Sequence, residues 1–231
     1  MPTPSTLSNV LFCGIVLVVA LFVVYALRRA AVGALPGIAL LSAYLVIPAV
    51  LARIGALDRY DPLPAPALIL VLALTLITVA ITTFSALGAR LTHAVPLGGI
   101  IALQAFRIPV EWVLHRLYLE GVIPVQMTYS GRNFDIITGI TGLLLGGWLL
   151  SGRTARRGVV LAWNVVGLLL LVNIVTIAVL STPVPFREFM DGPANLLPST
   201  FPYVWLPSFL VQVALGSHLL VFRHLRQRTS R

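Results

Sequence analysis

The sequence predicts an all-α fold, a polytopic transmembrane helical bundle of seven spans that forms a single domain over residues 1–231. Its composition is the first reason: 58% of the 231 residues are hydrophobic and 10% are charged, whereas a soluble domain carries about 25% charged residues. A mean hydropathy of +0.99 leaves little polar surface for water. The third reason is that several apolar runs approach the roughly 20 residues that a spanning helix needs.

Seven apolar runs are predicted to cross the bilayer. Because lipid cannot satisfy backbone polar groups, each run is expected to be helical, and the alternating pattern of barrel strands is absent. No residue before the first run is basic and Arg28 and Arg29 follow it, which favours an uncleaved anchor with its N-terminus outside. The predicted spans are 9–27, 35–52, 67–88, 95–119, 134–150, 159–180 and 203–222.

The arginines between the runs support this orientation. The segments expected inside hold ten arginines and no acidic residue, whereas those expected outside hold four arginines. An excess of arginine in short inner loops is typical of multi-pass proteins of the cell inner membrane. The inner set is Arg28, Arg29, Arg90, Arg153, Arg156, Arg157, Arg223, Arg226, Arg228 and Arg231. The outer set is Arg53, Arg59, Arg132 and Arg187, with Asp58, Asp61, Glu120, Glu188 and Asp191.

The net charge of +9 does not indicate a nucleic-acid partner. In a soluble chain an isoelectric point near 11 would suggest nucleic-acid binding. Here the arginines are scattered between apolar runs, so the expected partner is the lipid bilayer. The single cysteine, Cys13, excludes an internal disulfide and a thiolate metal cluster.

The fourth span carries four polar residues on one helical face. Gln104, Arg107, Glu111 and His115 are spaced three, four and four residues apart, which aligns them over about 16 Å of helix. Charged side chains near the bilayer centre cost about 2.5–3.5 kcal/mol each and usually face protein or a cavity. We expect Arg107 and Glu111 to neutralise one another across one helical turn.

Pro109 lies between Arg107 and Glu111 and is expected to kink this helix. Its ring removes one backbone hydrogen bond and clashes with the carbonyl of Ala105. A kink beside charged residues can open a cavity. Two interpretations remain open: an ion pair that locks the fourth span to its neighbours, or a ligand pocket.

Other helices place polar groups at a similar depth. Asn173 and Gln212 are candidates for the same pocket, although amides also support helix packing. A threonine stripe at Thr75, Thr78 and Thr82 has a similar alternative, hydrogen bonding to its own helix. Before the fifth span, Arg132 and Asp135 are candidates for the outer rim, while Asn133 resembles an N-cap; capping alone also explains Asn133 and Asp135.

Neither the histidines nor the catalytic and metal-binding motifs searched for identify a cofactor. His93 and His218 are expected at the inner interface, and a pair of axial haem ligands is the alternative interpretation of these two residues. The sequence contains no His-x-x-x-His, Glu-x-x-His or Gly-x-Ser-x-Gly motif and no phosphate-binding glycine loop. Zinc, di-iron and serine-hydrolase chemistry therefore lack support, and no metal site is predicted.

Three segments carry a resemblance to a known group. Gln104-Ala-Phe-Arg-Ile-Pro-Val-Glu111, Gly131-Arg-Asn-Phe-Asp135 and Trp163-Asn164 resemble those of an uncharacterised group of bacterial multi-pass membrane proteins, over roughly residues 100–225. The resemblance implies a bacterial inner-membrane protein and no particular activity. Seven spans also look like a microbial rhodopsin, but that family needs a lysine for retinal and this chain has none.

The leading functional hypothesis is transport or binding of a small polar or anionic ligand in an outward-facing intramembrane pocket. Arg107 would bind the ligand, Glu111 would neutralise it or exchange a proton, and His115 would guard the opening. Alternatives are a membrane-embedded enzyme acting on a lipid or isoprenoid substrate, with Glu111 or His115 as acid and base, and a haem-bearing electron carrier. The candidate ligand-binding residues are Gln104, Arg107, Glu111, His115, Arg132, Asp135, Asn173 and Gln212.

Overall fold

The computed structural model describes residues 2–58, 60 and 67–227, and this part of the chain contains helices and turns without a strand. The expectation of an all-α fold is therefore confirmed. Short 3₁₀ segments lie at Gln104–Phe106, Val125–Met127 and Leu197–Ser199, and a π-helical turn lies at Leu206–Leu210. The α-helices are α1 (Thr6–Arg29), α2 (Ala34–Arg53), α3 (Ala67–Phe84), α4 (Ala86–Ala94), α5 (Leu97–Leu103), α6 (Arg107–Leu119), α7 (Ile136–Leu150), α8 (Arg157–Leu180) and α9 (Val211–Gln227).

All seven predicted runs contain helix, and five helices in the described part of the chain are long and apolar enough to cross a membrane. They are α1, α2, Leu97–Leu119, α8 and Leu206–Gln227. The number rises to six if α3 and α4 are taken as one bent span. The remaining apolar helix, α7, has 15 residues.

The predicted span 67–88 is not a continuous helix. The α3 and α4 axes differ by 69°, and the break falls at Ser85, whose backbone is extended and whose hydroxyl accepts a hydrogen bond from Leu87 N. Gly88 permits this turn, because a Cβ there would lie 1.8 Å from the carbonyl oxygen of Thr83. The helix therefore ends at Phe84, four residues earlier than predicted.

The expected disturbance at Pro109 takes a different form. Leu97–Leu119 remains one span, without a break like the one between α3 and α4. Instead, the backbone tightens into a 3₁₀ segment at Gln104–Phe106. This segment contains Ala105, whose carbonyl would have bonded the N–H that Pro109 lacks.

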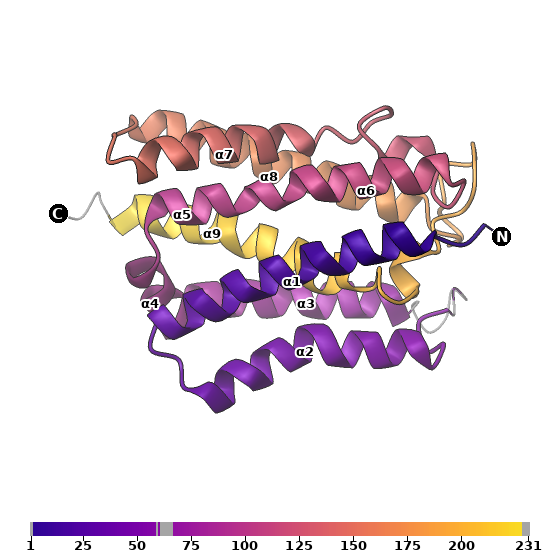
Figure 1. Cartoon of the computed structure of the whole chain (residues 1–231), viewed down its shortest axis with the longest axis horizontal. Coiled ribbons are helices and arrows are strands. Elements are labelled where there is room, and N and C mark those ends of the chain that lie inside the picture. The colour runs from indigo at the N-terminus through magenta and orange to yellow at the C-terminus, as the bar shows by residue number, and fades with distance from the viewer. Residues whose placement is uncertain (1, 59, 61–66, 228–231) are drawn as a thin grey trace.

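The helices run roughly side by side, and the start of α1 and the end of α9 lie at opposite ends of the bundle (Figure 1). The α1–α2 turn, α4, the α7–α8 connection and the C-terminal end of α9 lie at one end, so the segments expected inside share that end. The α6–α7 and α8–α9 connections lie at the other end with the N-terminus. Arg59, Asp61, Arg228 and Arg231 lie outside the described residues.

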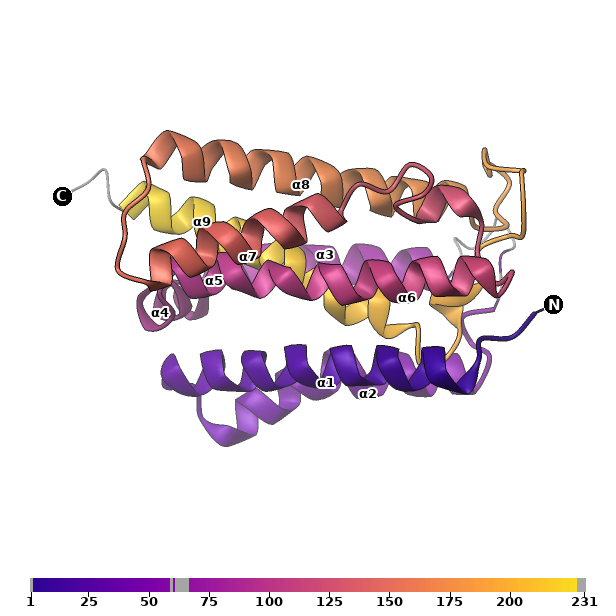
Figure 2. The same cartoon turned by 45° about the horizontal axis from the view of Figure 1, so that its top comes forward.

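The span made by α5 and α6 lies at the centre of the bundle, while α1 and α2 form a layer on one side (Figure 2). Of the most apolar stretch of Leu97–Leu119, 56% is buried inside the protein, compared with 6% for α2. Three polar residues of this span, Gln104, Arg107 and Glu111, are surrounded by protein.

Glycines allow α7 to approach α5 closely. A Cβ on Gly146 would lie 2.4 Å from the backbone nitrogen of Ala102, and one on Gly98 would lie 2.9 Å from the carbonyl oxygen of Gly146. Small residues at such contacts let two helix backbones touch, which is how apolar helices associate in lipid. The neighbouring Gly147 has no heavy atom within 4 Å of such a Cβ.

A hydrogen-bonded cluster ties the start of α1 to the end of α6. The Glu120 carboxylate accepts hydrogen bonds from Ser5 N (2.9 Å), Ser5 Oγ (2.7 Å) and Ser8 Oγ (2.8 Å), and Arg116 Nε lies 3.3 Å away. Partial burial raises the pKa of Glu120, but the hydrogen bonds and the neighbouring guanidinium outweigh it and hold the pKa below its usual value.

The glycine contact predicts opposite effects at two adjacent positions. Gly146→Ala is expected to lower the unfolding free energy by about 1–3 kcal/mol, because its methyl group meets the α5 backbone. Gly147→Ala, in open space on the same helix, is expected to leave stability unchanged or raise it by up to about 1 kcal/mol. Thermal unfolding of both variants in detergent checks this, and equal melting temperatures would contradict the close packing.

The hydrogen bonds and ion pair of Glu120 predict that the stability of the protein depends on pH. Because the pKa of Glu120 is lowered in the folded state, its stabilisation is fully present above the unfolded value, about 4.3. This contribution is lost as the pH falls through the folded pKa. Melting temperatures measured between pH 3 and 7 should show this acid loss in the parent and less of it in Glu120→Gln. Glu188→Gln, which removes an acid that forms no ion pair within the described residues, should follow the parent profile.

Candidate functional site

The centre of the site is a buried ion pair between α6 and the start of α7. Arg107 and Asp135 are 2% and 6% exposed, and Nη1 of Arg107 lies 2.5 Å from Oδ1 of Asp135. The same nitrogen lies 3.4 Å from the carbonyl oxygen of Gly167 on α8. The expected pairing of Arg107 with Glu111 is therefore wrong: the guanidinium reaches another helix instead of the next turn of its own.

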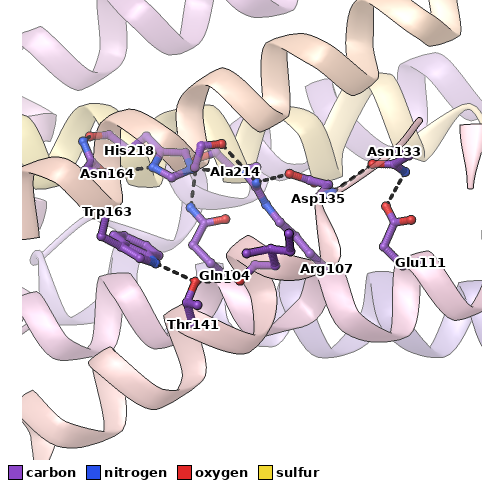
Figure 3. A network of polar contacts seen from close by, with 12 residues as sticks. Gln104, Arg107, Glu111, Asn133, Asp135, Thr141, Trp163, Asn164, Ala214 and His218 are labelled. Atoms are coloured by element: carbon purple, nitrogen blue, oxygen red, sulfur yellow. Dashed lines mark hydrogen bonds and ion pairs between the residues drawn. The ribbon is translucent and has the colours of Figure 1, made fainter. Parts of the chain in front are cut away.

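His218 and Asn164 extend this network toward α8 and α9 (Figure 3). Nη2 of Arg107 lies 3.2 Å from Nε2 of His218, and Nδ1 of His218 lies 2.8 Å from Oδ1 of Asn164. Because a guanidinium only donates, Nε2 accepts and Nδ1 carries the proton that Asn164 accepts. Asn164 Nδ2 in turn donates to the carbonyl oxygen of His218 (3.1 Å).

The two histidines differ in exposure. His218 is fully buried within the protein, whereas His93 on α4 is exposed. Both ring nitrogens of His218 already have partners, so the arrangement offers no nitrogen to a haem iron. Gly167 makes room for the ring, because a Cβ there would lie 2.7 Å from His218 Cε1.

Glu111 lies one turn beyond Arg107 and has a different partner. Its Oε1 accepts a hydrogen bond from Nδ2 of Asn133 at 2.6 Å. Asn133 also donates to Met127 O, and its Oδ1 accepts from Asp135 N at 3.0 Å, forming an Asx turn ahead of α7. Oε2 of Glu111 is buried and has no hydrogen-bond partner in the described structure.

Arg107, Glu111 and Asp135 border a cavity of about 100 Å³. Apolar side chains make up most of its wall, such as Leu72 of α3 and Leu171 of α8. Both α3 and α8 pack against α9, which contributes the remaining side. The cavity therefore combines an apolar body with a few charged groups at one side, as ligand pockets generally do.

Five other predicted residues do not border this cavity. Gln104 Nε2 donates to Ala214 O at 3.1 Å, and Gln212 Nε2 donates to Thr75 Oγ1 and Pro207 O, both at 2.8 Å. These two amides connect neighbouring helices.

The hydroxyls of Thr75, Thr78 and Thr82 donate to carbonyls of their own helix, as the structural alternative proposed.

The other three predicted residues outside the cavity are His115, Arg132 and Asn173, and they lie around the α6–α7 connection. Asn173 Nδ2 donates to the carbonyl oxygen of Arg132 at 2.9 Å, and the exposed Arg132 guanidinium lies 5.4 Å from the ring centroid of Phe189. His115 stacks on Tyr129 at 4.5 Å between ring centroids. These residues therefore shape the connection outside the cavity.

Sequence reasoning missed Asn164 and His218 as members of the network. Both are fully buried, and a buried histidine next to a buried asparagine is unusual enough to be informative. However, they lie 54 residues apart on α8 and α9. No spacing along the chain could have paired them, because their contact depends on how the two helices pack.

The fold and site define a class: an all-α bundle of apolar helices, compatible with a membrane protein, with a buried charged network beside a cavity. Residues 64–226 match a domain of unknown function (DUF8737), and the chain belongs to that family. The expected membership in an uncharacterised group is thus confirmed. No curated protein and no solved structure matches the chain.

The observed pairing predicts which carboxylate supports the fold. Asp135→Asn is expected to lower the unfolding free energy by about 3–5 kcal/mol, because it leaves the Arg107 charge buried without its partner. Glu111→Gln is expected to cost at most about 1 kcal/mol, since a glutamine oxygen still accepts the Asn133 hydrogen bond. Chemical unfolding in detergent measures both variants, and a larger loss in Glu111→Gln would contradict the Arg107–Asp135 pairing.

Proposed function

We propose that the protein is a multi-pass protein of the bacterial inner membrane with seven spans, its N-terminus outside and its C-terminus inside. The gathering of the predicted inner segments at one end supports this orientation (Figure 1). The α3–α4 pair and α7 are the sixth and seventh spans in this proposal. At 1.5 Å per residue α7 is about 22 Å long, shorter than the roughly 30 Å hydrocarbon core.

The short length of α7 favours a functional site at its N-terminal end. In this orientation, the turn from Asn133 to Asp135 lies at membrane depth. Irregular backbone at such depth is tolerated where it is buried in protein or lines a cavity. Unusually short apolar helices are one feature of the binding sites of membrane transporters. This turn carries the partners of both Glu111 and Arg107.

The proposed function is binding of an amphiphilic ligand, with the first part of its apolar chain in the cavity and a hydroxyl or amine group at Glu111. The unpartnered, buried Oε2 of Glu111 beside an apolar cavity is the observation that carries this proposal. Asp135 balances the charge of Arg107 and both terminal nitrogens have partners, while its buried Nε has none in the described structure. The favoured ligand group is therefore one that donates to a carboxylate, rather than the anion that Arg107 alone would select.

A lipid or isoprenoid substrate is a second candidate, because the apolar wall suits such a chain. In that case Glu111 would act as the acid or base of a membrane-embedded enzyme. Formation of a product from a lipid extract separates this function from binding or transport.

A matched series of ligands tests the site. Dodecylamine and dodecanol are expected to raise the melting temperature of the parent protein in nanodiscs, whereas dodecanoate is not. Glu111→Leu should lose this response, because it removes the accepting oxygen. His115→Ala, outside the cavity, should keep it. An equal response to dodecanoate, or a response retained by Glu111→Leu, would refute the proposal.

A further inference from the structure

A second cavity lies at the arginine-rich end of the bundle. Its volume is about 300 Å³, and residues of α5, α7, α8 and α9 line it together with the α7–α8 connection. Leu97, Leu149 and Val160 form part of an apolar wall, while Arg153 and Arg157 line the same cavity. Charged and apolar surfaces thus meet in one hollow, separate from the cavity beside Glu111.

Arg153 is held in position by its neighbours. Its guanidinium carbon lies 4.3 Å from the ring centroid of Trp148, and the Trp148 indole N–H donates to the carbonyl oxygen of Thr154 at 3.1 Å. Thr154 also lines the cavity. Stacking on an aromatic face orients a guanidinium while leaving its N–H groups at the ring edge free to donate.

The two arginines have no acidic partner. The ion pairs in the described part of the chain are Arg107–Asp135 and Arg116–Glu120. The connection 151–158 contains no aspartate or glutamate. Within the described residues neither Arg153 nor Arg157 therefore has an acid to balance its charge, and an anion would be attracted to both.

The apolar wall has a fixed shape. At Gly98 a Cβ would lie 2.9 Å from the carbonyl oxygen of Gly146 and 3.0 Å from both Leu149 Cβ and Leu150 Cγ. The backbone of α5 therefore presses directly on α7 where the two helices line the cavity. A wall packed this closely offers a preformed apolar surface beside the two arginines.

We propose that this cavity binds an anionic phospholipid of the leaflet at the C-terminal end. The phosphate interacts with Arg153 and Arg157, and the first part of an acyl chain lies along Leu97, Leu149 and Val160. Basic pockets between membrane helices bind anionic head groups for the same reason of charge. The apolar wall favours a lipid over a free phosphate, because a free phosphate leaves that wall uncovered.

Lipid titration of the full chain in nanodiscs tests the proposal. Phosphatidylglycerol is added to phosphatidylcholine nanodiscs, and bound lipid is measured by native mass spectrometry together with the melting temperature. The double variant Arg153→Ala/Arg157→Ala is expected to weaken phosphatidylglycerol binding by about tenfold or more. Arg28→Ala/Arg29→Ala is the matched control, since it removes two exposed arginines from the same end of the bundle; it should change binding by less than about threefold.

Three results would overturn the proposal. The first is an equal loss of phosphatidylglycerol binding in the two double variants. The second is binding of phosphatidylcholine as tight as that of phosphatidylglycerol. The third is a rise in melting temperature with inorganic phosphate or glycerol phosphate equal to that with phosphatidylglycerol. Arg153→Lys/Arg157→Lys keeps the charge and should retain more binding than the alanine pair. If the alanine pair does not fold, Arg153→Gln alone is compared with Arg28→Gln. The Glu111 cavity is unchanged in all these variants, so this test is independent of its ligand.

Discussion

The buried ion pair between Arg107 and Asp135 is the interaction on which the centre of this structure depends. A guanidinium that is 2% exposed must have its charge balanced, and here both terminal nitrogens also have acceptors, while Nε has none in the described structure. Asp135 supplies the charge, and His218 and Gly167 supply acceptors from two further helices. The pair thereby fixes how α6, α7, α8 and α9 meet. The Asx turn of Asn133 ahead of α7 holds the backbone of Asp135, whose side chain reaches the guanidinium.

This pairing also decides which group can meet a ligand. Because Asp135 pairs with Arg107, Glu111 is left without a positive partner on its own helix and accepts a hydrogen bond from the Asn133 amide instead. One of its oxygens is left without a partner beside an apolar cavity. The Arg107–Asp135 pair thus stabilises the fold, whereas the neighbouring Glu111 carboxylate serves the proposed binding.

The match to the family covers nearly all of this arrangement, although Tyr60, which also lines the cavity beside Glu111, precedes it. Residues 64–226 include the Arg107 network, the cavity beside Glu111 and the arginine-lined cavity at the opposite end. All of α1 and α2, which form a layer on one side, precedes the match, and α2 is scarcely buried. The first two helices contribute through the core residues Phe12, Val16 and Val19 of α1 and through the contact between Glu120 and the start of α1.

The sequence by itself determined the helical class, the apolar runs and the polar stripe from Gln104 to His115, because hydropathy and helical spacing are properties of neighbouring residues. It also marked Asn133 and Asp135 as the start of a helix. Only the tertiary structure decided the partners. An i,i+4 spacing shows that Arg107 and Glu111 can meet, but a carboxylate from α7 reached the guanidinium instead. Asn164 and His218 joined the network because α8 packs on α9, and that packing is set by the whole bundle rather than by any local pattern.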